Sequence, residues 1–250
     1  MKENQDMIGP VTSYEEILAH ESQGKMSALM TLEEGEACEG SLEKLEEFHR
    51  LGVRMMTFTW NYPNSLGFPG EPAASRLAQS QGLTHLGMEF LERMEELGII
   101  PDVSHLSDAG IRDLCRFAKK PFCASHSNAR SLCHRGRNLP DELIRGIAKR
   151  GGVIGANYYG PFLTATPDVL GRFYGYASDI AAHIRHIADV GGIDCIGLGS
   201  DFDGIDNNLE LKNCGSMRLL EQALKKAGFH ERELDKIFYQ NVLAFYKELL

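Results

Sequence analysis

The sequence predicts an α/β fold of the (β/α)8 TIM-barrel type, with a single domain over residues 1–250. Short apolar runs alternate with amphipathic stretches along the chain, as is typical of βαβ units around a parallel sheet. Glycine follows several amphipathic stretches, where it favours the end of a helix. The sequence contains no glycine-rich phosphate-binding loop after an early strand, as many open doubly wound sheets have. A closed barrel is therefore favoured over an open sheet.

Six apolar runs are predicted to form buried strands, near residues 27–32, 53–59, 99–103, 121–125, 153–157 and 195–200. Helices are predicted between and after them, at 41–51, 86–97, 108–118, 140–150, 177–190 and from 217 onward. A further helical stretch, 13–21, precedes the first of these strands. Because a complete barrel has eight βα units, we expect this chain to lack the first two. Its domain would then be an incomplete barrel with exposed strand edges.

Composition and charge restrict the partners that the chain can bind. Its 250 residues are 43% hydrophobic and 24% charged, as in an ordinary globular protein, and the formal net charge is −9. An acidic chain is a poor partner for nucleic acid or for an anionic membrane surface. The sequence has neither a membrane span, which needs roughly 18 apolar residues, nor a secretory signal. We therefore expect a cytoplasmic protein that binds a small molecule or another protein.

Two histidines follow consecutive predicted strands. His105 and His126 each end a short apolar run. In a parallel α/β fold the ends of the strands open into one shared mouth, so we expect the two imidazoles to lie together. A lone histidine is more often a hydrogen-bonded group than a ligand, but a pair at equivalent strand ends favours a metal site. A catalytic zinc ion also needs a carboxylate, which Glu33 or Glu34 could supply.

Two further groups complete the candidate site. The last predicted strand leads into Asp201 and Asp203, which are set among glycines that let the backbone approach closely. Aspartates there can act as a ligand, as a proton shuttle or only as part of a turn. In the segment 135–138, a guanidinium group, of Arg135 or Arg137, can hold a substrate carboxylate through two parallel hydrogen bonds. Each residue alone is also typical of a solvated loop, so the prediction depends on their meeting at one end of the barrel.

These motifs resemble the membrane dipeptidase (renal dipeptidase) family of zinc metallopeptidases, in particular its soluble microbial members. The resemblance extends from about Ser13 to the end of the chain. It is carried by motifs in the order of the family: TLEEG (31–35), GVRMMTFTWN (52–61), DVSH (102–105), ASHS (124–127), RNLPD (137–141) and GSDFDG (199–204).

The resemblance implies a dipeptidase that cleaves the peptide bond of dipeptides with a hydroxide that bridges two zinc ions. Glu33 would bridge the two ions, and His105 and His126 would complete the protein ligands of one of them. Arg137 would hold the C-terminal carboxylate of the substrate. Asp201 would be the catalytic acid and base that handles the proton passed to the leaving amine. Many members form dimers, so a homodimer is also expected.

The sequence departs from the family at two points. The family binds its other zinc ion through a His-x-Asp pair on the first barrel strand, and this chain has no such pair near its N-terminus. That ion would then have only Glu33 from this chain. The alternative is a truncated or impaired homologue that binds at most one zinc ion or needs a complementing segment.

The second departure is Trp60, where mammalian members carry a substrate-contacting histidine, and we expect it to alter specificity. A different metal-dependent barrel hydrolase, such as a phosphoesterase, would share only the fold.

Overall fold

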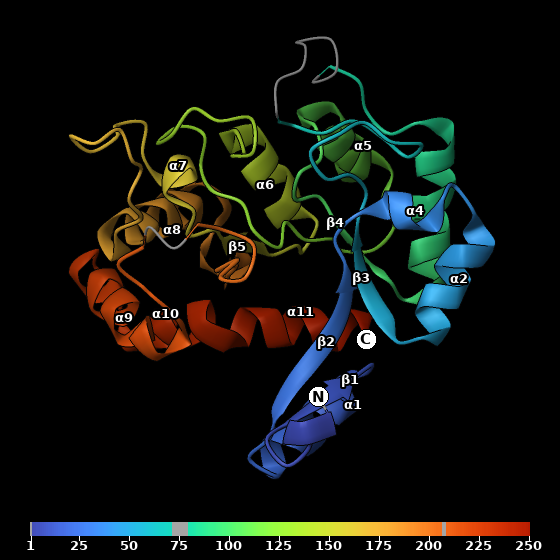
Figure 1. The fold of residues 1–250 in the computed structure, drawn as a ribbon, viewed down its shortest axis with the longest axis horizontal. Helices are drawn as coiled ribbons and strands as arrows, with labels where there is room; N and C mark the ends of the chain where they lie inside the picture. Colours follow the sequence, from blue (N-terminus) through green and yellow to red (C-terminus); the bar gives the residue numbers. More distant parts are fainter. Residues whose placement is uncertain (1, 72–79, 207–208) are drawn as a thin grey trace.

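A parallel sheet forms the centre of the computed structural model, which describes residues 2–71, 80–206 and 209–250 (Figure 1). Strand β1 pairs with β2, β2 with β3, and β3 with β4, always in parallel. Single bridges at Cys123 and Ala124 connect β4 to β5, which pairs with β6. The order in space therefore follows the order in the sequence. The strands are β1 (Ile8–Val11), β2 (Met26–Leu32), β3 (Val53–Thr57), β4 (Ile100–Asp102), β5 (Ile154–Ala156) and β6 (Ile196–Leu198).

The predicted strands differ from the observed ones in two places. Five of the six predictions correspond to β2–β6, whereas the run 121–125 forms only the two single bridges. The structure also has one earlier strand, β1. The sequence pattern missed it because Ile8 and Val11 enclose a glycine and a proline. Both of these residues weaken a strand signal, and proline is tolerated mainly on edge strands. The expectation that the first strand lies near residue 27 was therefore wrong.

The sheet is open between its first and last strands. Within the described ranges, no pairing connects β6 to β1 or β2. Figure 1 shows β1, α1 and the first half of β2 projecting from the body of the molecule, and Met26 is 60% exposed. That the chain lacks barrel units stays a prediction, but the number of two was derived from six strands and did not include β1.

Helices connect the strands and follow the last one, as predicted. Serine and threonine side chains cap several of them: Ser41, Thr84 and Ser107 each accept a hydrogen bond from the backbone of the first turn. Gly98 ends α4 in the left-handed conformation. The helices are α1 (Tyr14–Ser22), α2 (Leu42–Arg50), α4 (His85–Leu97), α5 (Asp108–Phe117), α6 (Asp141–Lys149), α7 (Gly160–Leu163), α8 (Ala177–Gly191), α9 (Met217–Lys226), α10 (Glu231–Asp235) and α11 (Asn241–Leu249).

Short helical turns accompany these helices. A π-helical turn, Lys236–Gln240, lies between α10 and α11. The 3-10 turns are Lys2–Asn4, Gly35–Cys38, Ile193–Cys195 and Cys214–Ser216. None of the helices in the described part of the chain is long and apolar enough to cross a membrane.

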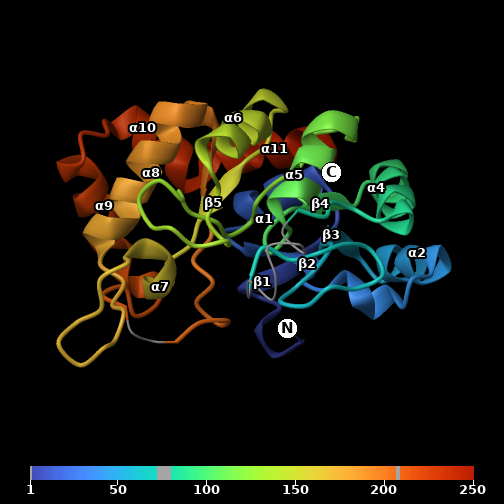
Figure 2. The same ribbon diagram turned by 90° about the horizontal axis from the view of Figure 1, so that it is seen from above.

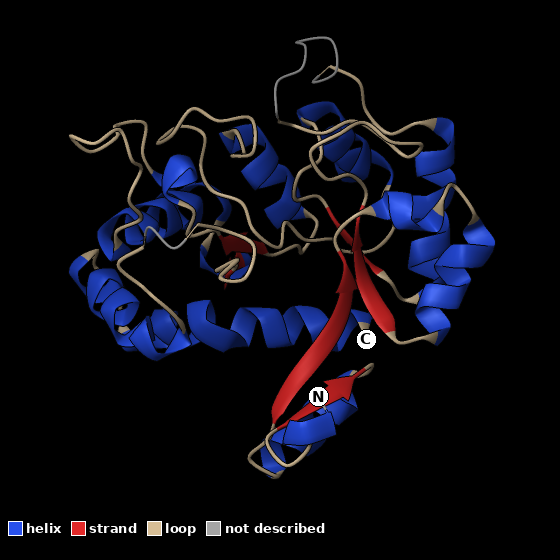
Figure 3. Ribbon diagram, viewed as in Figure 1, coloured by secondary structure: helices blue, strands red, loops and turns tan. Residues whose placement is uncertain are grey.

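Two sets of apolar side chains pack against the sheet. The main core contains fully buried residues such as Met56, Phe90 and Ile144, and it fills the space between the strands and the surrounding helices. Seen from above, α2 and α4 lie at one end of the molecule and α8 to α10 at the other (Figure 2). The strands lie between these two groups (Figure 3).

The second set lies on the inner face of the sheet. Side chains alternate along a strand, so Met55 points to the face opposite Met56. Ile100 packs there with Phe245 of α11, together with Cys123 and Val153. The C-terminal helix therefore covers part of the inner face. Asp102 and Ser125 lie on the same face, nearer the carboxyl ends of the strands.

Candidate active site

Three of the predicted ligands converge at the carboxyl ends of the strands. The Nε2 atoms of His105 and His126 are 3.0 Å apart. Oε1 of Glu33 lies 3.3 Å from Nε2 of His105 and 3.5 Å from Nε2 of His126. Both imidazoles are buried, whereas the Glu33 side chain is about half exposed. The structure thus brings two nitrogen donors and one oxygen donor to a single point that could hold a metal ion.

Glu34 has a different place. Its carboxylate accepts hydrogen bonds from the backbone of Trp60, from the side chain of Asn64 and from the backbone of Glu36. These contacts cap the turn at Gly35–Cys38 and tie it to the loop after β3. Of the two glutamates considered from the sequence, Glu33 is therefore the one that faces the histidines.

Burial keeps both imidazoles neutral. It lowers the pKa of His105 to about 2 and that of His126 well below its usual range, and the nearby charge of Arg137 lowers both further. Neutral imidazole is the form that binds a metal ion. Partial burial also raises the pKa of Glu33, and Arg137 opposes this effect.

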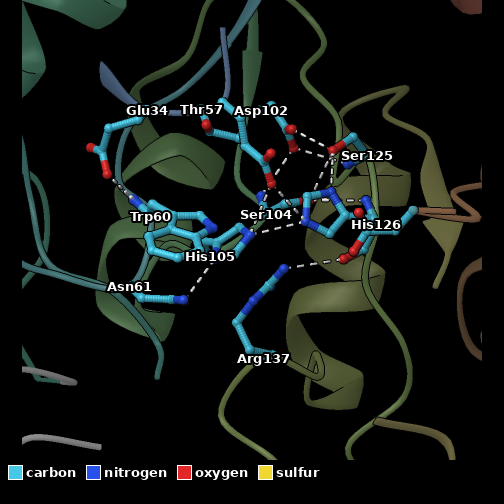
Figure 4. Close-up of polar contacts among 12 residues, drawn as sticks. Glu34, Thr57, Trp60, Asn61, Asp102, Ser104, His105, Ser125, His126 and Arg137 are labelled. Atoms are coloured by element: carbon cyan, nitrogen blue, oxygen red, sulfur yellow. Dashed lines mark hydrogen bonds and ion pairs between the residues drawn. The ribbon is translucent and has the colours of Figure 1, made fainter. Parts of the chain in front are cut away.

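The second nitrogen of each ring is held by a hydrogen-bonding partner (Figure 4). Nδ1 of His105 lies 3.1 Å from Oδ1 of Asn61, and Nδ1 of His126 lies 2.8 Å from Oγ of Ser125. Because the amide oxygen of Asn61 only accepts, His105 carries its proton on Nδ1 and turns the lone pair of Nε2 toward Glu33. Two oriented imidazoles and a carboxylate are a donor set that suits a zinc ion.

Backbone strain occurs at two of the predicted site residues. His105 has φ 70° and Asp201 has φ 58°, and Glu39 is the only other described residue besides glycine with a positive φ. A residue with a Cβ atom in this conformation costs on the order of 1–2 kcal/mol. Such strain persists where the surrounding structure enforces it, and it is concentrated at functional sites.

Arg137 lies buried beside the histidines. Its guanidinium group donates to the backbone oxygen of His126 at 3.4 Å and lies 5.6 Å from the ring centre of Phe162. Its Nε atom has no hydrogen-bond partner in the described part of the chain. Burial lowers the pKa of Arg137 to about 10, so the group stays charged at neutral pH. A buried cation with an open donor is suited to bind an anion.

A cavity of about 380 Å³ lies in front of these groups. Trp60 is on its wall, 42% exposed, with its ring centre 6.1 Å from that of His105. Its lining also includes Glu33, Asn61, His126, Arg137, Tyr159, Phe162, Asp201, Gly204, Ile205 and Asp206.

Asp201 lies on the lining of this cavity and is held by Asn157. The side-chain amide of Asn157 donates to Oδ2 of Asp201 at 3.2 Å. Burial raises the pKa of Asp201, whereas the hydrogen bond from Asn157 lowers it. Asp203, the other aspartate considered from the sequence, is exposed.

Several site residues were not singled out from the sequence. Asn61 and Ser125 hold the two imidazoles, and each adjoins a residue that was singled out. Asp102 begins the DVSH motif, and its role depends on a contact with Ser125 across two strand segments. Asn157 directly follows a predicted buried strand, and a polar residue at a strand end is a signal that could have identified it.

Two imidazoles and a carboxylate at the carboxyl ends of a TIM-type parallel sheet are typical of a metal-dependent hydrolase. The model of the membrane dipeptidase family, peptidase family M19, matches residues 1–249. The chain therefore belongs to this family of metal-dependent dipeptidases, which hydrolyse peptide bonds.

Comparisons with individual proteins agree with this assignment. A Klebsiella pneumoniae relative, described as an uncharacterized protein in the pqqA 5' region, is 33% identical over 224 residues, or 84% of this chain and 78% of the relative. The chain is also similar to a metallopeptidase from Rhodobacter sphaeroides crystallised with a phosphinate mimic of the dipeptide L-Ala-D-Ala. That match has a TM-score of 0.86 and 28% identity, and covers 97% of this chain and 69% of the other.

A third similar protein is the dipeptidase AC, a metallopeptidase of family M19. The match has a TM-score of 0.87 and 27% identity, and covers 99% of this chain and 72% of the other. These similarities confirm the predicted TIM-type fold and the resemblance to the dipeptidase family.

Gly204 offers a test of Asp201 that leaves its carboxylate intact. A Cβ atom added at Gly204 would lie 2.3 Å from Oδ1 of Asp201, so this side chain would have to move. If Asp201 acts on the substrate, Gly204→Ala is expected to lower kcat for a dipeptide by roughly tenfold or more, because small misplacements of a reacting group are costly. Metal content should not change.

The matched control is Gly67→Ala, whose added Cβ would meet no atom closer than 3.4 Å. Steady-state hydrolysis and elemental analysis of both variants make the comparison. Equal kcat values for the two variants would contradict a role for Asp201 in the reaction.

Proposed function

We propose that this chain is a zinc-dependent dipeptidase whose metal is held by Glu33, His105 and His126. The observation that carries the proposal is the convergence of two imidazole nitrogens and a carboxylate oxygen beside the open donor of a buried arginine. A zinc ion bound there would polarise the peptide carbonyl and lower the pKa of a water molecule.

The remaining residues bind the substrate and move protons. Arg137 would hold the C-terminal carboxylate of a dipeptide and so place the peptide bond next to the histidines. Asp201, oriented by Asn157, would take a proton from the attacking water and pass it to the leaving amine. Trp60 would contact the substrate side chains from the wall of the cavity. A dipeptide as substrate is supported by the Rhodobacter sphaeroides metallopeptidase, which binds a dipeptide mimic.

A free C-terminal carboxylate is the substrate feature that this arrangement recognises. We expect the zinc-loaded protein to hydrolyse an unblocked dipeptide and to lose about 100-fold or more in kcat/KM on the C-terminal amide of the same dipeptide. Leaving a buried charge without its partner costs about 3–5 kcal/mol, and each 1.4 kcal/mol is a factor of ten.

The test is a kinetic assay with both peptides, repeated after removal of the metal by a chelator and after zinc is restored. Activity should disappear with the metal and return with it. Equal rates on acid and amide would contradict carboxylate recognition, and hydrolysis that survives chelation would contradict a metal-dependent reaction.

A second candidate follows from the number of zinc ions that the chain can hold. Within residues 2–71, 80–206 and 209–250, Glu33, His105 and His126 are the only group of three or more side chains with metal-binding geometry. This favours at most one zinc ion per chain. The second candidate is therefore an impaired homologue with one metal ion, or one that needs a complementing segment. Dipeptide hydrolysis by the zinc-loaded chain, measured together with its zinc content and with its oligomeric state for the expected homodimer, distinguishes the candidates: an active chain supports the first, and an inactive chain with bound zinc supports the second.

A further inference from the structure

Asp102 lies buried on the inner face of the sheet, behind His126, and its carboxylate accepts hydrogen bonds from Ser104 and Ser125. Its Oδ1 atom accepts from the backbone N–H groups of Ser104 and Ser125, each at 2.9 Å. Its Oδ2 atom lies 2.5 Å from Oγ of Ser125 (Figure 4). Burial raises the pKa of Asp102 above its usual value, and the donors from Ser104 and Ser125 oppose this effect because they stabilise the ionised form.

When Asp102 is ionised, its contacts fix the direction in which the Ser125 hydroxyl donates. Two oxygens 2.5 Å apart need a proton between them, and the ionised Asp102 has none, so Ser125 donates to it. The backbone N–H of His126 donates to Oγ of Ser104 at 3.0 Å. Oγ of Ser104 lies 3.2 Å from Oγ of Ser125, and its hydroxyl can donate to Ser125 or to Asp102; in both cases the Ser125 proton stays on the side of Asp102. Ser125 can then only accept from Nδ1 of His126, 2.8 Å away, so that nitrogen must carry a proton.

We propose that Asp102, acting through Ser125, is a positioning residue that fixes the proton of His126 on Nδ1 and so presents the lone pair of Nε2 to the metal. This inference rests on the proposed metal site and adds to it the groups that set its affinity. In metalloproteins a carboxylate often orients a ligating histidine directly. Here a serine hydroxyl connects the two. His105 is oriented separately, by Asn61.

The substitution Asp102→Asn should reverse this chain of hydrogen bonds. An asparagine has one acceptor oxygen, which must take the place of Oδ1 to satisfy the two backbone N–H groups. Its NH₂ group would then donate to Ser125, whose hydroxyl proton would turn to Nδ1 of His126. The ring proton of His126 would move to Nε2, the atom that the metal needs.

The experiment measures the histidine tautomers and zinc affinity in the full chain. Ring ¹⁵N NMR of the metal-free protein gives the tautomers, and competition with a chromophoric chelator gives the affinity. For the unsubstituted chain we expect His126 protonated on Nδ1. For Asp102→Asn we expect the proton on Nε2 and zinc affinity lower by about 10–100-fold, the usual cost of losing such a partner. The His105 tautomer is the internal control and should not change.

A second pair of variants protects the test against misfolding of Asp102→Asn. Ser125→Ala removes the connecting hydroxyl and should also weaken zinc binding, whereas Ser125→Thr keeps the hydroxyl and should restore it. Zinc affinity within twofold of the unsubstituted chain in both Asp102→Asn and Ser125→Ala would overturn the inference. Weaker binding with the His126 proton still on Nδ1 in Asp102→Asn would also overturn it, since the effect would then be only structural. Neither readout uses a substrate, so a failure here leaves the dipeptidase proposal untouched.

Discussion

Replacement of His126 by alanine is expected to remove the bound metal and to lower kcat/KM for a dipeptide by more than about 100-fold. Loss of an outer partner of a metal ligand already costs about 10–100-fold, and His126 would be a direct ligand. Its Nε2 atom lies 3.0 Å from that of His105, and few other donors are near enough to replace it. Metal analysis and steady-state kinetics of the purified variant measure the effect.

The matched control for this variant is His134→Ala. His134 lies eight residues further along the chain, is exposed, and is not part of the metal-binding group. We expect its metal content and kinetics to equal those of the unsubstituted chain. If His126→Ala kept both its metal and its activity, His126 would not be a metal ligand.

The second large effect is expected from Arg137→Ala. The guanidinium group is buried at the cavity and keeps one donor open. Its loss would leave the substrate carboxylate without a partner, and we expect kcat/KM for an unblocked dipeptide to fall by about 100- to 1000-fold. Arg137→Lys keeps the charge but not the two parallel N–H groups, so its kcat/KM should lie between that of the unsubstituted chain and that of Arg137→Ala.

The C-terminal amide of the dipeptide makes this test specific. If Arg137 binds the carboxylate, the amide should be cleaved at similar rates by the unsubstituted chain and by Arg137→Ala. A variant that loses activity equally on acid and amide would show that Arg137 supports the structure of the site instead. Arg135→Ala is the control, because Arg135 is two residues away and does not line the cavity.

Strand periodicity predicted much of the fold and the meeting of the site residues. His105, His126 and Asp201 each follow a short apolar run, and the parallel order of the strands brings the three runs to one end of the sheet. Such reasoning works where the end of an apolar run marks the point at which the chain leaves the sheet. It missed β1, where Gly9 and Pro10 interrupt the pattern although pairing with β2 still forms.

The finer geometry of the site depends on contacts between distant segments. The left-handed backbone of His105 and Asp201 is imposed by the surrounding structure, because histidine and aspartate favour it only weakly. The choice between Glu33 and Glu34 follows from the contacts of Glu34 with Trp60 and Asn64. The link from Asp102 to Ser125 requires two neighbouring strand segments in one register. A single sequence does not specify these contacts.

The most direct test of the central claim is to measure zinc content and dipeptide hydrolysis on the same sample. The unsubstituted chain is compared with the double variant His105→Ala, His126→Ala after both have been loaded with zinc and desalted. We expect at least one zinc ion per unsubstituted chain with hydrolysis of the dipeptide, and neither in the double variant. A double variant that keeps its zinc and its activity, or an unsubstituted chain that binds no zinc, would contradict it.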